Sequence, residues 1–124
     1  QHEAERLLEQ KICCSEDAIQ GAIALVKRGD FKAVILTMGK QGVAYSEDGV
    51  QGEWLPAFIV DAIDTVAAGD CFNGALAAAM VDGASLRDSI LFAMAAAAMS
   101  VTRRGASSSI PSLLEVQDFL ARLR

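Results

Sequence analysis

The sequence predicts an α/β fold, and three observations support this prediction. Hydrophobic residues make up 52% of the 124 residues, which is enough to form a core in one ordinary domain. Residues 33–37 form a short apolar run after a helix-like segment and a short loop, a pattern typical of a buried parallel strand. Apolar residues recur at helical spacing in residues 15–28, 69–81 and 85–103.

The first half of the chain contains two expected helices and a hairpin. We expect a short helix at residues 3–9 and a longer one from Ser15, which has acidic residues in its first turn and ends at two cations and Gly29. Residues 43–46 and 53–60 have strand-like composition, and the turn residues Glu-Asp-Gly between them predict a hairpin. Pro56 limits the second strand to an edge or a break, because it cannot donate to a ladder.

The second half is expected to be mainly helical. Helices are predicted at about residues 69–81 and 85–103, followed by a loop at 105–109. A final amphipathic helix is predicted at about residues 112–123. We therefore interpret residues 1–124 as one partial domain.

Charge and cysteine content narrow the possible functions. The net charge is −5, from 16 acidic and 11 basic side chains, which disfavours nucleic-acid binding. The three cysteines are an odd number and two are adjacent, so we expect a reducing, cytoplasmic setting and not a disulfide framework. The longest apolar run, residues 90–101, is too short to span a bilayer, and we expect no membrane partner.

Residues 64–74 form the most informative motif. Asp64 and Asp70 flank a run of small residues that leads into an apolar helix-like segment. The start of a helix offers unpaired N–H groups and the positive end of a dipole, so an anion can bind there. A carboxylate beside such an anion can accept a proton, which is the arrangement that phosphoryl transfer requires.

Each of these residues also has a purely structural interpretation. Asp70 could be an ordinary first-turn acid, and Asp64 could be either a solvated loop residue or a cation ligand. Gly39 and Gly42 could be turn glycines or part of a nucleotide loop. Thiol catalysis by Cys71 is disfavoured, because the single histidine of the chain is distant in sequence.

Four stretches resemble the ribokinase-like, or pfkB-type, carbohydrate kinases, and especially the members that act on ribose. They are residues 64–76, 34–43, 92–98 followed by 101–106, and 3–5. The resemblance implies a three-layer αβα fold with a mostly parallel sheet. This chain would be its C-terminal, nucleotide-binding portion, without the N-terminal half and its lid.

The resemblance also implies roles for individual residues. Asp70 would be the general base that contacts the sugar hydroxyl, and the N–H groups of Ala67, Ala68 and Gly69 would form an anion hole. Glu3 would organise Mg²⁺ indirectly, through water. The implied ATP site consists of Met38, Gly39, Lys40, Gln41, Gly42, Val43, Gly69, Asp70 and Met94. The implied site for a monovalent cation such as K⁺ consists of Asp64, Val66, Ser100, Arg103, Gly105 and Ser109.

The activity implied by the resemblance is ATP-dependent phosphorylation of a sugar, with ribose converted to ribose 5-phosphate. Another sugar (fructose, a keto-deoxy sugar acid or a nucleoside) and a non-catalytic nucleotide-binding fragment are the alternatives. We expect the isolated fragment to be inactive and the full-length protein to form a homodimer. The sequence departs from the family pattern at Ala67, where glycine is common, at Cys71, where threonine is common, and at Met94, where a polar residue is frequent.

Overall fold

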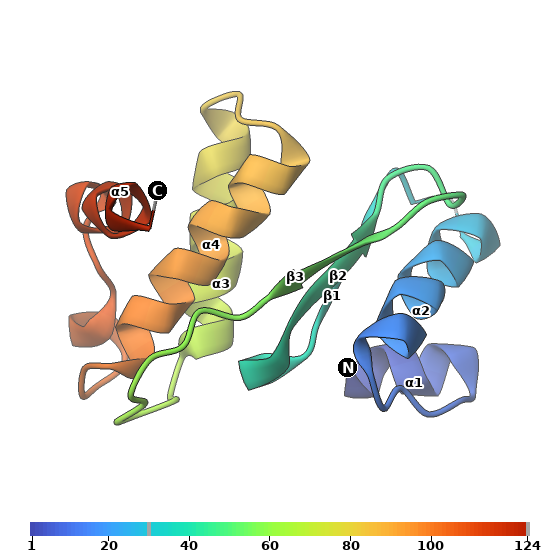
Figure 1. The fold of residues 1–124 in the computed structure, drawn as a ribbon, viewed down its shortest axis with the longest axis horizontal. Coiled ribbons are helices and arrows are strands. Elements are labelled where there is room, and N and C mark those ends of the chain that lie inside the picture. Colours follow the sequence, from blue (N-terminus) through green and yellow to red (C-terminus); the bar gives the residue numbers. More distant parts are fainter. Residues whose placement is uncertain (30, 124) are drawn as a thin grey trace. The chain divides into compact units, whose positions relative to one another are not determined.

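The chain folds into two compact units in a computed structural model that describes residues 1–29 and 31–123 (Figure 1). The first unit is Gln1–Ala57 and the second is Phe58–Arg124. The mixture of helices and strands confirms the predicted α/β class. The elements, in chain order, are α1 (His2–Leu8), α2 (Ser15–Arg28), β1 (Val34–Thr37), β2 (Gly42–Ser46), β3 (Glu53–Pro56), α3 (Ala68–Val81), α4 (Leu86–Val101) and α5 (Leu113–Arg122), with short 3₁₀ turns at Gly39–Gln41 and Ser107–Ser109.

Helix α2 begins and ends where its sequence predicts. Glu16 and Asp17 occupy its first turn, and Lys27 and Arg28 occupy its last, so both ends have charges that complement the helix dipole. The Asp17 carboxylate accepts a hydrogen bond from the N–H of Cys13 at 3.0 Å, which fastens the preceding loop to the helix start.

The sheet of the first unit has the order β1-β2-β3, and both strand pairs are antiparallel. Leu36 of β1 lies opposite Ala44 of β2, and Ala44 lies opposite Trp54 of β3. The hairpin prediction is confirmed. The parallel pairing expected for residues 33–37 is not found among residues 1–29 and 31–123, where β1 pairs only with β2. Only residues 38–41 separate these two strands, and a turn this short can join only antiparallel strands.

Strand β3 ends earlier than its composition predicts. It runs only to Pro56, whereas the expected segment continued to Val60. Pro56 lies at the end of a strand on the sheet edge, so its missing N–H costs no ladder hydrogen bond. The constraint expected from this proline is therefore confirmed.

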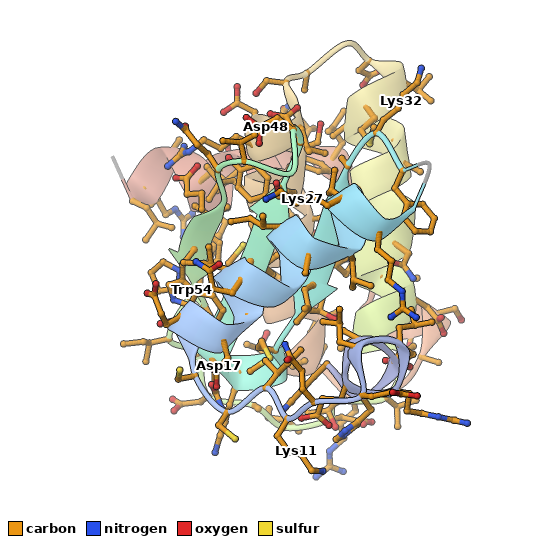
Figure 2. The ribbon with its side chains drawn as sticks, turned by 90° about the vertical axis from the view of Figure 1, so that its right-hand side faces the viewer. Lys11, Asp17, Lys27, Lys32, Asp48 and Trp54 are labelled. Carbon is orange, nitrogen blue, oxygen red and sulfur yellow. The ribbon has the colours of Figure 1, made fainter. Side chains whose placement is uncertain are left out.

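Helix α2 covers one face of this sheet and forms the core of the first unit with it. Figure 2 shows α2 crossing the strands, with Trp54 beside it. The tip of the β2–β3 hairpin also meets α2, because a Cβ on Gly49 would contact the side chains of Val26 and Lys27. The buried core cluster consists of Ala4, Ile12, Ala18, Leu25, Leu36, Met38 and Ala44, with Leu8, Ile19, Val34 and Trp54 against it.

The second unit is built from α3, α4 and α5. Ser85 caps α4 by accepting a hydrogen bond from the N–H of Asp88. A buried cluster of Cys71, Ala95, Ala96 and Val116 joins the three helices, and the rings of Phe58 and Phe119 meet edge to face at 5.4 Å beside it. Within residues 1–29 and 31–123, no helix has the length and apolar character needed to cross a bilayer.

Candidate functional site

The N-terminus of α3 has an unusual backbone conformation. Ala67, the residue before the helix, has φ 62° and ψ 12°, which is the left-handed region that residues with a Cβ rarely adopt. Holding an alanine in this region costs about 1–2 kcal/mol. Strain of this kind is typical of sites where the surrounding structure imposes a functional geometry.

The first turn of α3 presents N–H groups to solvent. The N–H of Cys71 donates to the carbonyl of Ala67 at 2.9 Å, and that of Ala68 makes a longer bond of 3.3 Å to the carbonyl of Thr65. In the part of the chain that the structure describes, the N–H groups of Gly69 and Asp70 have no hydrogen-bond partner. Both residues are exposed, so the two free donors and the Asp70 carboxylate lie together at the positive end of the helix dipole.

The Asp64 carboxylate joins the loop before α3 to the loop after α4. Its Oδ1 accepts the N–H of Val66 at 3.0 Å, and its Oδ2 accepts the N–H of Gly105 at 3.2 Å. These two hydrogen bonds, that from Val66 foremost, lower the pKa of Asp64 below its usual value. Asp64 is therefore ionised at neutral pH and holds together two segments that are 41 residues apart.

The carbonyl end of α4 meets the same two loops. The Val101 carbonyl accepts the N–H groups of Ile63 and Asp64, at 2.6 and 3.1 Å. The N–H of Arg103 donates to the Ser100 carbonyl at 3.2 Å, which tightens the turn after the helix. The Ser109 side chain is 1% exposed, and its hydroxyl donates to the carbonyl of Ala106.

The six residues expected at a monovalent-cation site thus gather in one loop cluster of the second unit. Carbonyl and carboxylate oxygens are the donors that a hard cation prefers. The carbonyl end of α4 adds the negative end of a helix dipole. The chemistry of these residues therefore fits a cation of this kind.

The structure buries Cys71 and adds one contact that the sequence patterns did not reveal. Burial raises the pKa of the Cys71 thiol, which disfavours its use as a nucleophile. The guanidinium of Arg103 donates from Nη2 to Oε1 of Glu115 on α5 at 2.7 Å. The spacing Ser112-x-x-Glu115 is a sequence signal for the capping box that begins α5, but nothing in it indicates the arginine.

The expected nucleotide loop, residues 38–43, consists of the tight turn between β1 and β2 and the first two residues of β2, all in the first unit. Gly39 has φ 54° and Gly42 has φ 145°, and a Cβ on Gly42 would overlap the carbonyl oxygen of Leu55. The Met38 side chain belongs to the core, whereas Lys40 and Gln41 are exposed. The turn therefore needs its glycines for structural reasons and presents its polar residues to solvent.

Two further expected site residues, Glu3 and Met94, lie on helices. Glu3 is on α1 of the first unit, and its side chain is 92% exposed. Met94 is a buried residue of α4 in the second unit.

Comparison with known proteins identifies the family. Residues 1–113 match the family described as pfkB family carbohydrate kinase. The chain is 43% identical over 118 residues to a ribokinase of Schizosaccharomyces pombe, an alignment that covers 94% of this chain and 37% of the yeast protein. The chain therefore belongs to the pfkB family of carbohydrate kinases, and it spans about 37% of the length of this relative.

Solved structures give the same result for the fold. The structure of Arabidopsis thaliana ribokinase complexed with ribose and ATP matches with a TM-score of 0.85 and 32% identity, over 96% of this chain and 38% of the plant chain. The structure of Escherichia coli phosphofructokinase-2 in complex with potassium matches with a TM-score of 0.83 and 26% identity, over 99% of this chain and 39% of that chain. The chain thus has the ribokinase-like α/β fold that its motifs indicate.

Proposed function

We propose that the protein containing this chain transfers a phosphoryl group from ATP to a sugar hydroxyl, with ribose to ribose 5-phosphate as the leading reaction. The first turn of α3 is the observation that carries this proposal. Two N–H groups without partners in the described chain stand there beside the exposed Asp70 carboxylate. The likeness to a ribokinase that binds ribose and ATP supports the choice of sugar.

Asp70 is the proposed general base. Its carboxylate accepts the proton of the sugar hydroxyl as that oxygen attacks the phosphoryl group. Because the transition state of phosphoryl transfer is loose, little negative charge has to be created on the attacking oxygen, and a weakly basic carboxylate suffices.

The proposed anion hole consists of the N–H groups of Ala67, Ala68 and Gly69. These dipoles stabilise the charge on the oxygens of the transferring group, and they need no reorientation when the charge develops. The N–H of Ala68 takes part by exchanging its 3.3 Å bond to Thr65 for a phosphoryl oxygen. The surrounding structure holds Ala67 in its strained conformation directly before this turn.

The nucleotide and the ions have proposed positions on the remaining residues. In the first unit, the turn at residues 38–43 is the proposed nucleotide loop, and Glu3 would orient Mg²⁺ through water. In the second unit, Met94 is the proposed adenine-side residue. The loop cluster around Asp64 and Gly105 holds K⁺, and the potassium complex of the E. coli phosphofructokinase-2 supports this choice. A cation bound there supplies a positive charge close to the start of α3.

Replacement of the proposed base tests the mechanism. In the full-length protein, we expect Asp70→Asn to lower kcat by about 10²–10⁴-fold. The Kd for ATP, measured by calorimetry, should change less than about threefold. Asp82→Asn is the matched control, because Asp82 is an exposed residue just after the other end of the same helix. Turnover by Asp70→Asn at the wild-type rate would remove Asp70 from the mechanism.

A substrate panel separates the alternatives. Rates of ADP release with ribose, fructose, a keto-deoxy sugar acid and a nucleoside rank the candidate substrates by kcat/KM. We expect ribose to rank first, and a higher kcat/KM for fructose would favour the fructose alternative, which the similarity to plant fructokinases supports. For residues 1–124 alone we expect ATP binding without turnover, since the chain spans about 37% of its relative.

A further inference from the structure

The ion pair between Arg103 and Glu115 connects the proposed cation loop to α5. The Arg103 Nη2 and Glu115 Oε1 atoms are 2.7 Å apart, a distance typical of a strong charge-assisted hydrogen bond. The side chains are 35% and 44% exposed, so both are partly shielded from water. The carboxylate remains ionised at neutral pH, because Arg103 and the N–H of Ser112 lower the pKa of Glu115 to about 2.

Glu115 is a firm anchor because it is held on its other side as well. Its Oε2 accepts the N–H of Ser112 at 2.6 Å, and its own N–H donates to the Ser112 hydroxyl at 3.3 Å, which together form the capping box of α5. The next residue, Val116, is 2% exposed and belongs to the buried cluster shared with Cys71 and Ala95. The carboxylate is therefore attached to a packed helix and not to a loop.

Arg103 lies in a segment that is held at both ends, and its own N–H donates to the Ser100 carbonyl at 3.2 Å. The segment leaves α4 at Val101, whose carbonyl binds the Asp64 loop, and it is bound again where the N–H of Gly105 donates to Asp64. Gly105 has φ 97°, a conformation that a residue with a Cβ rarely adopts. The ion pair with Glu115 fixes the Arg103 side chain between these two points.

We propose that Glu115, acting through Arg103, is a positioning residue that orients the carbonyl groups of Arg103 and Gly105 for the monovalent cation. This inference rests on the proposed function, which places a cation at this loop. Glu115 does not touch the cation; it sets the geometry of the groups that do. The expected result of breaking the pair is weaker cation binding and a more mobile loop, with α5 still folded.

Two variants separate this role from simple stabilisation of α5. Glu115→Gln removes the ion pair, but its side-chain oxygen can still accept the N–H of Ser112 and preserve half of the capping box. Ser112→Ala removes the capping hydroxyl and leaves the ion pair intact. A purely structural role for Glu115 would make the two variants behave alike.

The first measurement is the rise in melting temperature of the chain as KCl replaces tetramethylammonium chloride at constant ionic strength. Wild type is expected to gain stability with K⁺ in a saturable manner. The K⁺ concentration at half-saturation should rise about three- to fivefold in Glu115→Gln, as expected for losing one partly exposed ion pair, and should change less than twofold in Ser112→Ala. Equal half-saturation in wild type and Glu115→Gln would overturn the inference.

The second measurement is hydrogen exchange of the Gly105 amide without added K⁺. We expect exchange about three- to fivefold faster in Glu115→Gln than in wild type, with little change in Ser112→Ala. Unchanged exchange at Gly105 in Glu115→Gln would refute the positioning role. If Gly105 exchanges faster in Glu115→Gln but the melting temperature of wild type does not respond to K⁺, Glu115 controls the loop and the proposed cation site is rejected. Failure of the inference and failure of the proposed cation site therefore give different results.

Discussion

Ala67 has a conformation that its side chain makes unfavourable, and it lies directly before the turn that we propose to hold the transferring phosphoryl group. Its φ of 62° places its Cβ close to backbone atoms, a conflict that glycine would avoid. The neighbouring small residues, Ala68 and Gly69, follow in the helix itself. The cost of this conformation is therefore concentrated at a single residue of the proposed anion hole.

Substitution of Ala67 by glycine should stabilise the chain. We expect Ala67→Gly to raise the free energy of unfolding by about 0.5–1 kcal/mol, because relief of the left-handed strain exceeds the added entropy of glycine in the unfolded state. Urea denaturation measures the change. The matched control is Ala68→Gly, which lies in the helix and should lower stability by up to about 1 kcal/mol. A destabilising Ala67→Gly would contradict the left-handed conformation.

At the scale of elements, the β1–β2 turn shows how one short segment serves both fold and site. Its two glycines have positive φ, but they differ in the space around them. A Cβ on Gly39 would meet nothing within 4 Å, whereas one on Gly42 would meet backbone atoms of β3. Gly42 is therefore required by strand packing as well as by its dihedral angles.

The two glycines should thus respond differently to alanine. Gly42→Ala is expected to lower the free energy of unfolding by about 3 kcal/mol or more, because the new Cβ overlaps the Leu55 carbonyl and the backbone cannot move without breaking the ladder. Gly39→Ala carries only the dihedral strain and should cost about 1 kcal/mol. Thermal or urea denaturation of both variants gives the comparison, and equal losses would show that β3 does not approach Gly42 closely.

At the same scale, the helices were largely predictable from the sequence. The bounds of α2 follow from its charged ends, and the starts of α4 and α5 follow from Ser85 and Ser112, since these signals act within a few residues. The pairing direction of β1 was not predictable, because a buried apolar run has the same composition in parallel and antiparallel sheets.

At the scale of the whole molecule, carboxylates with lowered pKa values occur in both units. Hydrogen bonds from backbone N–H groups are the leading cause for Glu5, Asp17 and Asp48 in the first unit and for Asp64 in the second, and Arg103 is the leading cause for Glu115. A group whose pKa is lower in the folded than in the unfolded state stabilises the fold above its unfolded pKa. That stabilisation disappears as the pH falls through the folded pKa.

Acid should therefore destabilise the chain. We expect the melting temperature to be nearly constant from about pH 7 to pH 5 and to fall as pH drops from about 4.5, near the unfolded carboxylate values, towards 2. Thermal denaturation at stepped pH and constant ionic strength provides the measurement. Asp48→Asn should flatten the dependence of melting temperature on pH, because Asp48 accepts the N–H groups of Val50 and Gln51. Asp88→Asn is the control, because Asp88 is not one of the five carboxylates named above, and it should leave the dependence unchanged. A melting temperature that rises on acidification would contradict the assigned directions.

Short segments of the sequence were enough to indicate the family, the helices, the hairpin and the proposed base at the start of α3. Caps, turns and the 64–74 motif depend only on residues that are close together in the chain. The contact of Asp64 with Gly105 and that of Arg103 with Glu115 depended on the folded chain. These contacts join segments brought together by helix packing, and no spacing in the sequence encodes that packing directly. The left-handed backbone at Ala67 also required the structure, because an alanine at that position favours another conformation until its surroundings impose this one.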